Sequence, residues 1–496
     1  MIQTGKLLVI QGGDNVAVAL REIVPGEPLD LPEGPAAACA GISAGHKVAL
    51  RHIGAGQSVV KYGQVIGVAT VDIPAGDHAH THNVRTALIS GVQYEYSPSL
   101  TKLPETETRS FMGFAREDGR VSVRNEIWVL PTVGCVNRTA LLAAERASRS
   151  FAGVTDGIFA FTHPYGCSQL GDDHANTQRI LAGLARHPNA AGVLILGLGC
   201  ENNGIEPFKR VLGDFDERRI RFLVAQNEGD EIESAVNAIG ELAQAAAGCR
   251  RVPCPASKLV IGLKCGGSDG FSGVTANPLV GAVSDRLLAI GGSALLTEVP
   301  EMFGAEANLM SRAVNRNIFQ KTVEMVEGFK RYYSDHGQPI YENPSPGNKE
   351  GGITTLEDKS LGCTQKAGSA PVQDVLPYGG QARVPGLSLL AGPGNDIVAC
   401  TALAAAGAHM ILFTTGRGTP LGAPVPTLKI SSNTRLAGRK PHWIDFDAGR
   451  LVSGAEGTAL AEELLDLVLA TASGQLARNE TNGYREIAIF KGGVTL

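Results

Sequence analysis

The chain has 496 residues, of which 43% are hydrophobic and 19% charged, and its formal net charge is −5. This length predicts about three domains, each with its own core. The negative charge and an aromatic content of 5% argue against a nucleic acid partner, which needs a positive or base-stacking surface. No stretch approaches a membrane span and the first apolar run is too short for a signal peptide, so we expect a cytoplasmic protein without a membrane partner.

Residues 1–92 are predicted to form a small β-rich domain. Between residues 46 and 84, short apolar or alternating runs are separated by "GAG", "YG" and "PAG", which is typical of strands joined by tight turns. The polar, proline-containing segment 93–110 is expected to be a linker.

From residue 111, strands are predicted to alternate with helices. The stretches 154–168 and 190–203 each pass from an apolar strand into a glycine-rich turn, and helical spacing predicts helices over 172–188 and 230–249. The stretch "RRVPCPAS" divides this part into a second α/β domain, 111–250, and a C-terminal α/β domain, 251–496. Such alternation predicts mainly parallel sheets, with ligands beyond the carboxyl ends of their strands.

Histidines gather in the predicted β domain. His78, His80 and His82 alternate along one short stretch, and His46 lies in an earlier one. Alternate residues of a strand share one face, so the row suits a transition metal or an anionic substrate. A solvated, hydrogen-bonded edge strand is the alternative.

Five of the nine cysteines lie beside glycine, with short polar residues or lysine close behind; they are Cys135, Cys167, Cys200, Cys265 and Cys363. Thiolates bind iron, zinc and iron–sulfur clusters, and glycine permits close approach of the backbone to a bound group. The spacing matches no zinc-ribbon or ferredoxin motif, so a buried thiol without a ligand is the alternative for each cysteine.

Further polar residues in the predicted strand-end loops suit a hydroxylated, carboxylate-bearing substrate. Candidates for proton transfer are His163, His174, Lys264 and Lys366. Candidates for binding the substrate are Arg124, Asn202, Asn203, Ser268, Lys349 and Arg417. For any single one, the alternative is a side chain that only stabilises its loop. No glycine-rich motif for a nicotinamide cofactor leads into a helix.

Taken together, these motifs resemble the altronate/galactarate dehydratase family over essentially the whole chain. The motifs are "AGDHAHTHN", "TVGCVN", "YGCSQLGDDH", "LGLGCENN", "CGGSDGFSGVTANP", "LTEVPEMFGAE", "YENPSPGNKEGGITTLEDKSLGCTQKAG", "FTTGRGTP" and the final "REIAIFKGGVTL". The first of them resembles the N-terminal SAF-like β-clip domain of that family.

The resemblance implies a hydro-lyase that converts D-altronate into 2-dehydro-3-deoxy-D-gluconate in hexuronate breakdown. It also implies a divalent metal, typically Fe²⁺, with Mn²⁺ as an alternative and an iron–sulfur cluster left open. We expect the histidine row to hold the metal, with Cys363 and the other glycine-flanked cysteines as second choice. Either Lys366 or His163 is expected to take the C2 proton.

Three other interpretations remain open from the sequence. Galactarate dehydratase or another acid-sugar lyase, such as a sulfo-lyase, would have related motifs. A non-catalytic sugar-acid binding protein is a more distant alternative. The resemblance to this family also leads us to expect a homo-oligomer.

Overall fold

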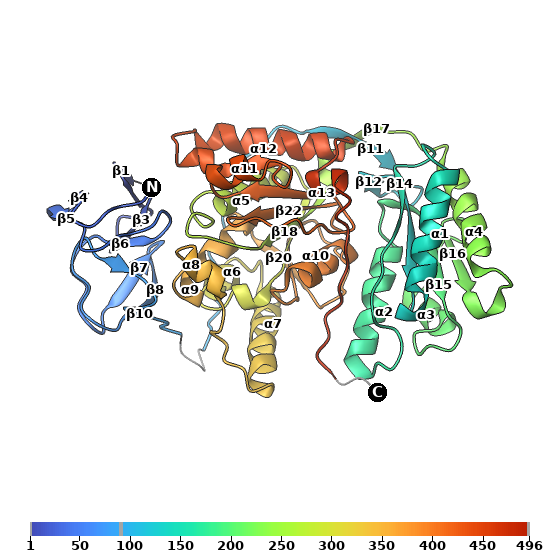
Figure 1. The fold of residues 1–496 in the computed structure, drawn as a ribbon, viewed down its shortest axis with the longest axis horizontal. Coiled ribbons are helices and arrows are strands. Elements are labelled where there is room, and N and C mark those ends of the chain that lie inside the picture. Colours follow the sequence, from blue (N-terminus) through green and yellow to red (C-terminus); the bar gives the residue numbers. More distant parts are fainter. Residues whose placement is uncertain (1, 89–92, 494–496) are drawn as a thin grey trace.

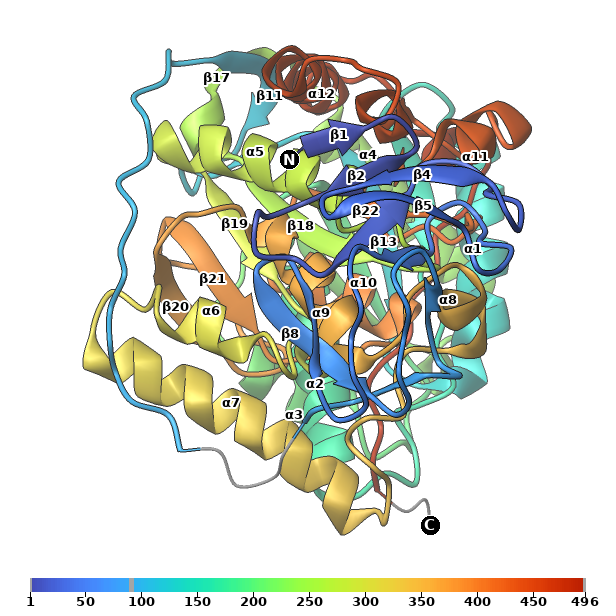
Figure 2. The ribbon, with the colours of Figure 1, turned by 90° about the vertical axis from the view of Figure 1, so that its left-hand side faces the viewer.

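In the computed structural model of the chain, which describes residues 2–88 and 93–493, three bodies lie along one long axis (Figure 1). The N-terminal β domain is at one end, the C-terminal α/β domain is in the middle and the second α/β domain is at the other end. The order in space therefore differs from the order in the chain. The segment after the β domain runs along the outside of the C-terminal domain (Figure 2), where Tyr94 donates to Glu306 at 2.6 Å.

The N-terminal domain is β-rich, as predicted. Its antiparallel sheet has the order β1-β2-β3-β6-β9, and a second sheet has the order β10-β8-β7. The strands are β1 (Ile2–Thr4), β2 (Leu7–Val9), β3 (Val16–Ala19), β4 (Pro28–Leu31), β5 (Gly34–Ala37), β6 (Lys47–Ala49), β7 (Ser58–Lys61), β8 (Gln64–Ala69), β9 (His78–Ala79) and β10 (Val84–Arg85). Tight turns with glycine at positive φ, such as Gly45 and Gly76, allow such short strands to reverse.

The second domain has a parallel sheet with the order β14-β13-β15-β16. Its strands are β13 (Glu126–Pro131), β14 (Gly157–Ala160), β15 (Ala190–Gly197) and β16 (Ile220–Val224). Its helices are α1 (Asn137–Ser150), α2 (Gly171–Ala185), α3 (Ile205–Leu212) and α4 (Glu231–Ala246). The helices predicted over 172–188 and 230–249 are thus confirmed as α2 and α4.

The C-terminal domain has a seven-stranded sheet with the order β20-β21-β19-β18-β22-β23-β24, in which every pairing is parallel. The strands are β18 (Val260–Cys265), β19 (Ser293–Leu296), β20 (Val372–Leu376), β21 (Gly386–Leu390), β22 (Met410–Thr415), β23 (Thr427–Ser431) and β24 (Phe446–Asp447). The helices are α5 (Ala276–Ala289), α6 (Glu306–Met310), α7 (Arg316–Asp335), α8 (Pro346–Glu350), α9 (Leu356–Cys363), α10 (Asp396–Ala405), α11 (Thr434–Arg439), α12 (Gly457–Ala472) and α13 (Arg478–Thr481). The α/β prediction with mainly parallel sheets is confirmed for both later domains.

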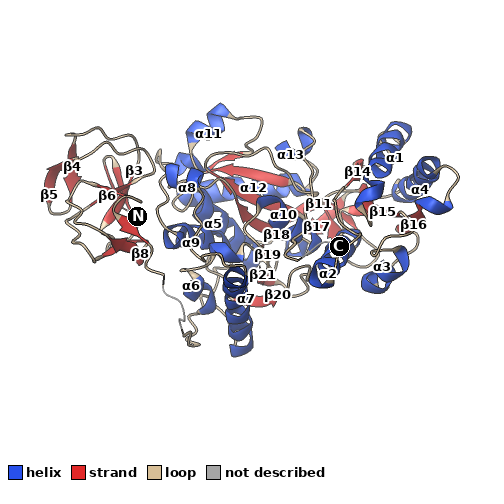
Figure 3. Ribbon diagram, turned by 60° about the horizontal axis from the view of Figure 1, so that its bottom comes forward, coloured by secondary structure: helices blue, strands red, loops and turns tan. Residues whose placement is uncertain are grey.

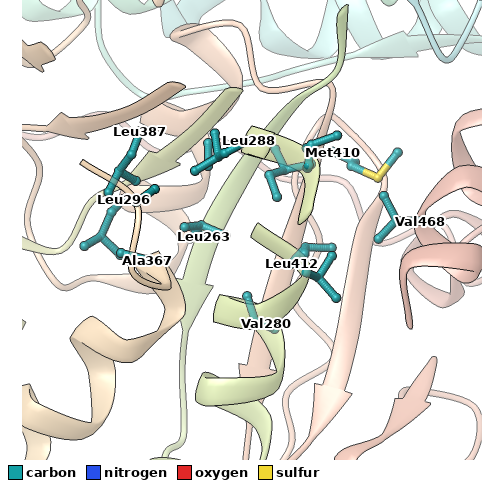
Figure 4. Packing of buried hydrophobic residues seen from close by; sticks show 14 of the residues in the cluster. Leu263, Val280, Leu288, Leu296, Ala367, Leu387, Met410, Leu412 and Val468 are labelled. Carbon is teal, nitrogen blue, oxygen red and sulfur yellow. The ribbon is translucent and has the colours of Figure 1, made fainter. Parts of the chain in front are cut away.

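Helices cover the large sheet and bury its apolar side chains (Figure 3). Leu263 of β18 and Leu412 of β22 pack with Val280 of α5, and Met410 lies near Val468 of α12 (Figure 4). Strands buried on both faces need apolar residues at nearly every position. The sequences of these strands are therefore nearly continuous hydrophobic runs.

The second and C-terminal domains are joined by a small sheet and by a shared core. β11 (Ser110–Ala115) pairs with β12 (Val121–Ser122) and with β17 (Val252–Pro255). One apolar cluster includes Trp128 of β13, Ile180 of α2 and Ile411 of β22. The two domains are thus packed together as one unit. Among the described residues, no helix has both the length and the hydropathy needed to cross a membrane.

Candidate active site

Two of the predicted cysteines meet inside the C-terminal domain. Cys265 ends β18 and Cys363 ends α9, and their Sγ atoms lie 3.3 Å apart as free thiols. Both thiols lie within hydrogen-bonding distance of Glu301 Oε2, at 3.1 Å and 3.2 Å. We call these three buried residues the thiol cluster. Their ligand atoms lie within 4.8 Å of one another, and two sulfurs with a carboxylate oxygen suit iron or zinc.

Two predicted proton-transfer residues, Lys264 and Lys366, border the thiol cluster. Lys366 Nζ lies 2.7 Å from Cys265 Sγ and 3.1 Å from Glu298 Oε2, and Lys264 pairs with the other oxygen of Glu298. Burial alone would lower the pKa of Lys366, but Cys265 and Glu298 outweigh it and raise that pKa. Burial would also lower the pKa of Lys264, but Glu298 and Asp396 outweigh this effect and raise that pKa. Both lysines are therefore cations that suit stabilisation of negative charge better than acceptance of a proton.

The turn after β19 supplies two carboxylates of this region, Glu298 and Glu301. Glu298 has a positive φ of 70°, a conformation that costs free energy for a residue with a side chain. Its carboxylate accepts from both lysines and from the backbone N–H of Cys265 at 3.1 Å, which holds the turn in place. Three residues on, Glu301 ends the 3₁₀ turn η4 (Val299–Glu301) and pairs with Lys359 at 2.8 Å.

Three of the four predicted histidines converge in the β domain, where His46 precedes β6, His78 lies on β9 and His80 follows β9. We call His46, His78 and His80 the histidine triad, because their ligand atoms lie within 4.8 Å of one another. His46 Nδ1 lies 3.0 Å from His78 Nε2. His82 is exposed, and its ring lies 5.3 Å from that of His78 between centroids.

The triad also touches the C-terminal domain. His46 Nε2 lies 3.1 Å from the carbonyl oxygen of Glu350, and His80 Nδ1 lies 3.0 Å from Thr354 Oγ1. Burial lowers the pKa of His78 to about 4 and that of His80 to about 3, with smaller effects from neighbouring cations. The imidazoles are therefore neutral at neutral pH, the form that binds a metal.

A cavity of ≈ 750 Å³ opens between the β domain and the C-terminal domain. Its polar lining includes Asp269, Glu350, Arg417, Ser432, Asn433, Arg435, Arg439 and Lys440. A small cavity of ≈ 10 Å³ shares Asp269 with it and is lined by Lys359 and Cys363. Asp269 thus links the open cavity to the buried cluster. Burial raises the pKa of Asp269, although Ser432, Ser272 and Asn433 donate to its carboxylate.

A buried carboxylate joins the β domain to α9. Asp358 pairs with Lys47 at 2.8 Å and with Lys61 at 3.0 Å, and all three side chains are at most 3% exposed. We call these residues the lysine clasp. Burial raises the cost of the Asp358 charge, but Lys47 and Lys61 hold its pKa well below the ordinary value. Burial lowers the pKa of Lys47 to about 8.

Several predicted site residues lie in the second domain, away from the triad and the thiol cluster (Figure 1). His163 is buried, with Nε2 2.8 Å from the Pro131 carbonyl oxygen and Nδ1 accepting from the Tyr165 N–H. Burial lowers its pKa to about 4. Its ring is hydrogen-bonded inside the second domain and is not among the residues that line the cavity described above. The other residues of this group are His174, Asn202, Asn203, Cys135, Cys167 and Cys200.

The predicted substrate-binding residues also lie in different parts of the structure. Arg124 is 1% exposed and pairs with Glu480 at 2.7 Å, so its guanidinium is occupied in the core and not at the cavity. Arg417 lines the cavity and pairs with Glu350 at 3.0 Å, while Lys349 lies in α8 beside it. Ser268 lines the small cavity.

Sequence reasoning missed four residues that the structure brings to this region, namely Asp269, Glu301, Asp358 and Lys359. All four lie within motifs quoted above, namely "CGGSDGFSGVTANP", "LTEVPEMFGAE" and "YENPSPGNKEGGITTLEDKSLGCTQKAG". A charged residue at the end of a parallel strand was the available signal. No local signal marks Asp358, because its partners are 297 and 311 residues away.

Comparison with known proteins matches each of the three domains to a family model. The family model "Altronate/galactarate dehydratase SAF domain" matches residues 5–87, "D-galactarate dehydratase/Altronate hydrolase, second domain" matches 113–247, and "D-galactarate/Altronate dehydratase, C-terminal" matches 256–495.

Full-length relatives agree with these models. The altronate dehydratases of Escherichia coli (strain K12) and Bacillus subtilis (strain 168) are each 52% identical, over 97% of this chain and 98% of theirs. Galactarate dehydratase (L-threo-forming) of Escherichia coli (strain K12) is 33% identical over 88% of this chain and 86% of its own. With its β domain and both α/β domains matched, the chain belongs to the altronate/galactarate dehydratase family.

Proposed function

We propose that this protein is a hydro-lyase that removes water across C2 and C3 of D-altronate, giving 2-dehydro-3-deoxy-D-gluconate in hexuronate breakdown. The observation that carries the proposal is the histidine triad, which touches the C-terminal domain beside an open polar cavity. The 52% identity to two altronate dehydratases supports this substrate.

The cavity offers the groups that a sugar acid requires. Arg435, Arg439 and Lys440 provide cations for the carboxylate, and Ser432 and Asn433 provide short partners for hydroxyls. Its volume of ≈ 750 Å³ lies within the range of small-molecule sites.

We assign Fe²⁺ to the histidine triad, with Mn²⁺ as the alternative metal and the thiol cluster as the second candidate site. Three neutral imidazole nitrogens fit such an ion. When bound, the ion supplies a Lewis acid for the substrate carboxylate and hydroxyl.

The chain's own residues have separate tasks in this proposal. Removal of the C2 proton leaves negative charge beside the carboxylate. We assign the proton acceptor to Asp269, because it lines the cavity and burial raises its pKa above the ordinary value. Lys264 and Lys366, whose pKa values are raised by their acidic neighbours despite burial, contribute positive charge at the thiol cluster.

The test is anaerobic turnover of D-altronate with ferrous iron supplied and then chelated, followed by 2-keto-3-deoxy acid formation. His80→Ala should lower kcat/KM by at least about 100-fold, because it removes a ligand, and should bind less iron. His82→Ala is the matched control, since His82 lies next to the triad but outside it. Equal turnover in the two variants would refute the assignment of the metal to the triad.

Galactarate is the second candidate substrate. A diacid needs two separate cationic anchors, and the cavity holds Arg417 as well as Arg435, Arg439 and Lys440. Faster turnover of galactarate than of D-altronate would favour this activity. Affinity without turnover of either acid would instead indicate a binding protein.

A further inference from the structure

The charged side chains on the wall of the open cavity are unevenly paired. The lining includes two carboxylates and four cations, namely Asp269, Glu350, Arg417, Arg435, Arg439 and Lys440. Asp269 is 9% exposed, whereas the side chain of Glu350 is 72% exposed. Glu350 is therefore the solvent-exposed carboxylate of this lining, and its pairing decides where the cavity offers free positive charge.

Arg417 is the cation that Glu350 neutralises. Its Nη2 lies 3.0 Å from Glu350 Oε2, and its Nη1 donates to the Gly347 carbonyl oxygen at 3.3 Å. A Cβ at Gly347 would lie 3.6 Å from Arg417 Nε, so the guanidinium lies directly against α8. An exposed pair of this kind adds little stability, but it cancels the net charge at this part of the wall.

The cations on and beside α11 have no acidic partner. Within the described ranges 2–88 and 93–493, the side chains of Arg435 and Arg439 form no ion pair. Lys440 Nζ lies over the ring of Trp443, 4.3 Å from its centroid, a contact that leaves its positive charge in place. The free positive charge of the cavity is therefore concentrated at α11.

Glu350 is held at the cavity by the helix that it ends. α8 begins with a capping box in which the side chains of Ser345 and Asn348 each bond the backbone of the other residue. Asn348 Nδ2 also donates to the Ser268 carbonyl oxygen at 2.8 Å. At the other end of α8, the Glu350 carbonyl oxygen lies 3.1 Å from His46 Nε2. Contacts with both domains thus fix the position from which Glu350 reaches Arg417.

We propose that Glu350 is a specificity-determining residue, which favours sugar acids with one carboxylate over diacids by neutralising Arg417. The inference rests on the proposed function, because it concerns which acid the same cavity accepts. A residue that rejects the wrong substrate through like charge is a common source of specificity.

The two candidate substrates differ in the group that meets this ion pair. One carboxylate of either acid has the cations of α11 as partners. At the far end of its carbon chain, D-altronate has a hydroxyl, which donates to Glu350 and accepts from Arg417. Galactarate has a second carboxylate instead, which Glu350 repels and for which the charge of Arg417 is already neutralised.

The test compares galactarate with D-altronate in the full chain supplied with ferrous iron, and the readout is the ratio of kcat/KM for galactarate to kcat/KM for D-altronate. Glu350→Gln should raise this ratio by about 5-fold to 10-fold, because it releases the charge of Arg417 for the second carboxylate. The double variant Glu350→Gln with Arg417→Gln should return the ratio to the wild-type value. Glu117→Gln, which breaks an exposed pair with Arg218 in the second domain, is the matched control and should keep the wild-type ratio.

The ratio separates specificity from structural damage, because damage lowers the turnover of both acids alike. An unchanged ratio in Glu350→Gln, or a raised ratio that persists in the double variant, would overturn the inference and leave the proposed dehydration standing. Absence of turnover in the wild type would contradict the proposed function instead. The dissociation constants of the two acids, measured by calorimetry, would then give the corresponding ratio and decide the role of Glu350 separately.

Discussion

Single side chains in the thiol cluster carry several interactions at once. Glu301 accepts from Cys265 and Cys363 through one oxygen and pairs with Lys359 through the other. Burial disfavours its charge, but Lys359 and the neighbouring lysines hold its pKa well below the ordinary value. A buried charge of this kind is stabilising only while its partner is present.

Glu301→Gln should lower the free energy of unfolding by about 3 kcal/mol or more, because Lys359 loses its counter-charge in the interior. Denaturant unfolding measures this change. Glu145→Gln, which removes half of an exposed pair with Arg149, should change stability by less than about 1 kcal/mol. The double variant Glu301→Gln with Lys359→Met should recover part of the loss, and a double variant that is less stable than the single one would contradict the pairing.

Glycine allows the backbones of two domains to touch beside the cavity. A Cβ at Gly270 would lie 1.9 Å from the carbonyl oxygen of Gly45. Gly270→Ala should therefore push the β domain away from Asp269 and lower kcat/KM by about 10-fold to 100-fold, since misplacement by 1 Å is costly. Gly12→Ala, where no atom lies within 4 Å of the added Cβ, is the control. Unchanged turnover of Gly270→Ala would show that the contact is not needed.

At the scale of elements, a buried histidine links β18 and β22 to the small joining sheet. His409, just before β22, accepts from the Val260 N–H at 2.9 Å and donates to the Val121 carbonyl oxygen at 2.9 Å. Burial lowers its pKa to about 4. The neutral ring is thus built into the junction of the second and C-terminal domains.

Acid should weaken this junction. The pKa of His409 is lower in the folded state than in the unfolded chain, so its stabilising effect is complete above about pH 6.5 and is lost as pH falls toward 4. We expect this residue to account for a loss of about 2 kcal/mol between pH 7 and pH 5. Denaturant unfolding across that range should show a shallower pH dependence in His409→Gln. An identical slope in both proteins would exclude His409 as a source of it.

At the scale of the molecule, the β domain is held to the C-terminal domain by polar contacts and by two small apolar clusters, one with Leu361 and the other with Phe271. The lysine clasp places two cations of the β domain on one carboxylate of α9. His46, His80 and Thr86 add contacts to Glu350, Thr354 and Glu357. The cavity and the histidine triad both depend on this association.

Asp358→Asn should release the β domain, because Lys47 and Lys61 would then lie buried without a counter-charge. We expect faster limited proteolysis in the segment 93–110, together with loss of D-altronate turnover. Asp374→Asn, which breaks a pair with the half-exposed Lys321, should leave both unchanged. Proteolysis at the wild-type rate in Asp358→Asn would mean that the clasp does not hold the domain.

The expected homo-oligomer stays a prediction, for which light scattering is the measurement.

Local patterns in the sequence predicted most of the fold. The alternation of strands and helices, the helices α2 and α4 and the β-rich first domain follow from spacing of apolar residues and from turn residues, which act within a few neighbours. The same patterns placed most of the glycine-flanked cysteines at strand ends, but Cys363 instead ends the helix α9. The motif set was also long enough to indicate the family.

Which of those loops meet was decided by tertiary packing. The thiols of Cys265 and Cys363 come into contact although 98 residues separate them in the sequence. The other three glycine-flanked cysteines lie in another domain. Lys47 and Asp358 meet across 311 residues, and Arg124 is drawn into an ion pair with Glu480. Such contacts depend on the order of strands in each sheet and on how whole domains dock. Both are set by the sum of many distant contacts, so no short stretch of sequence contains them.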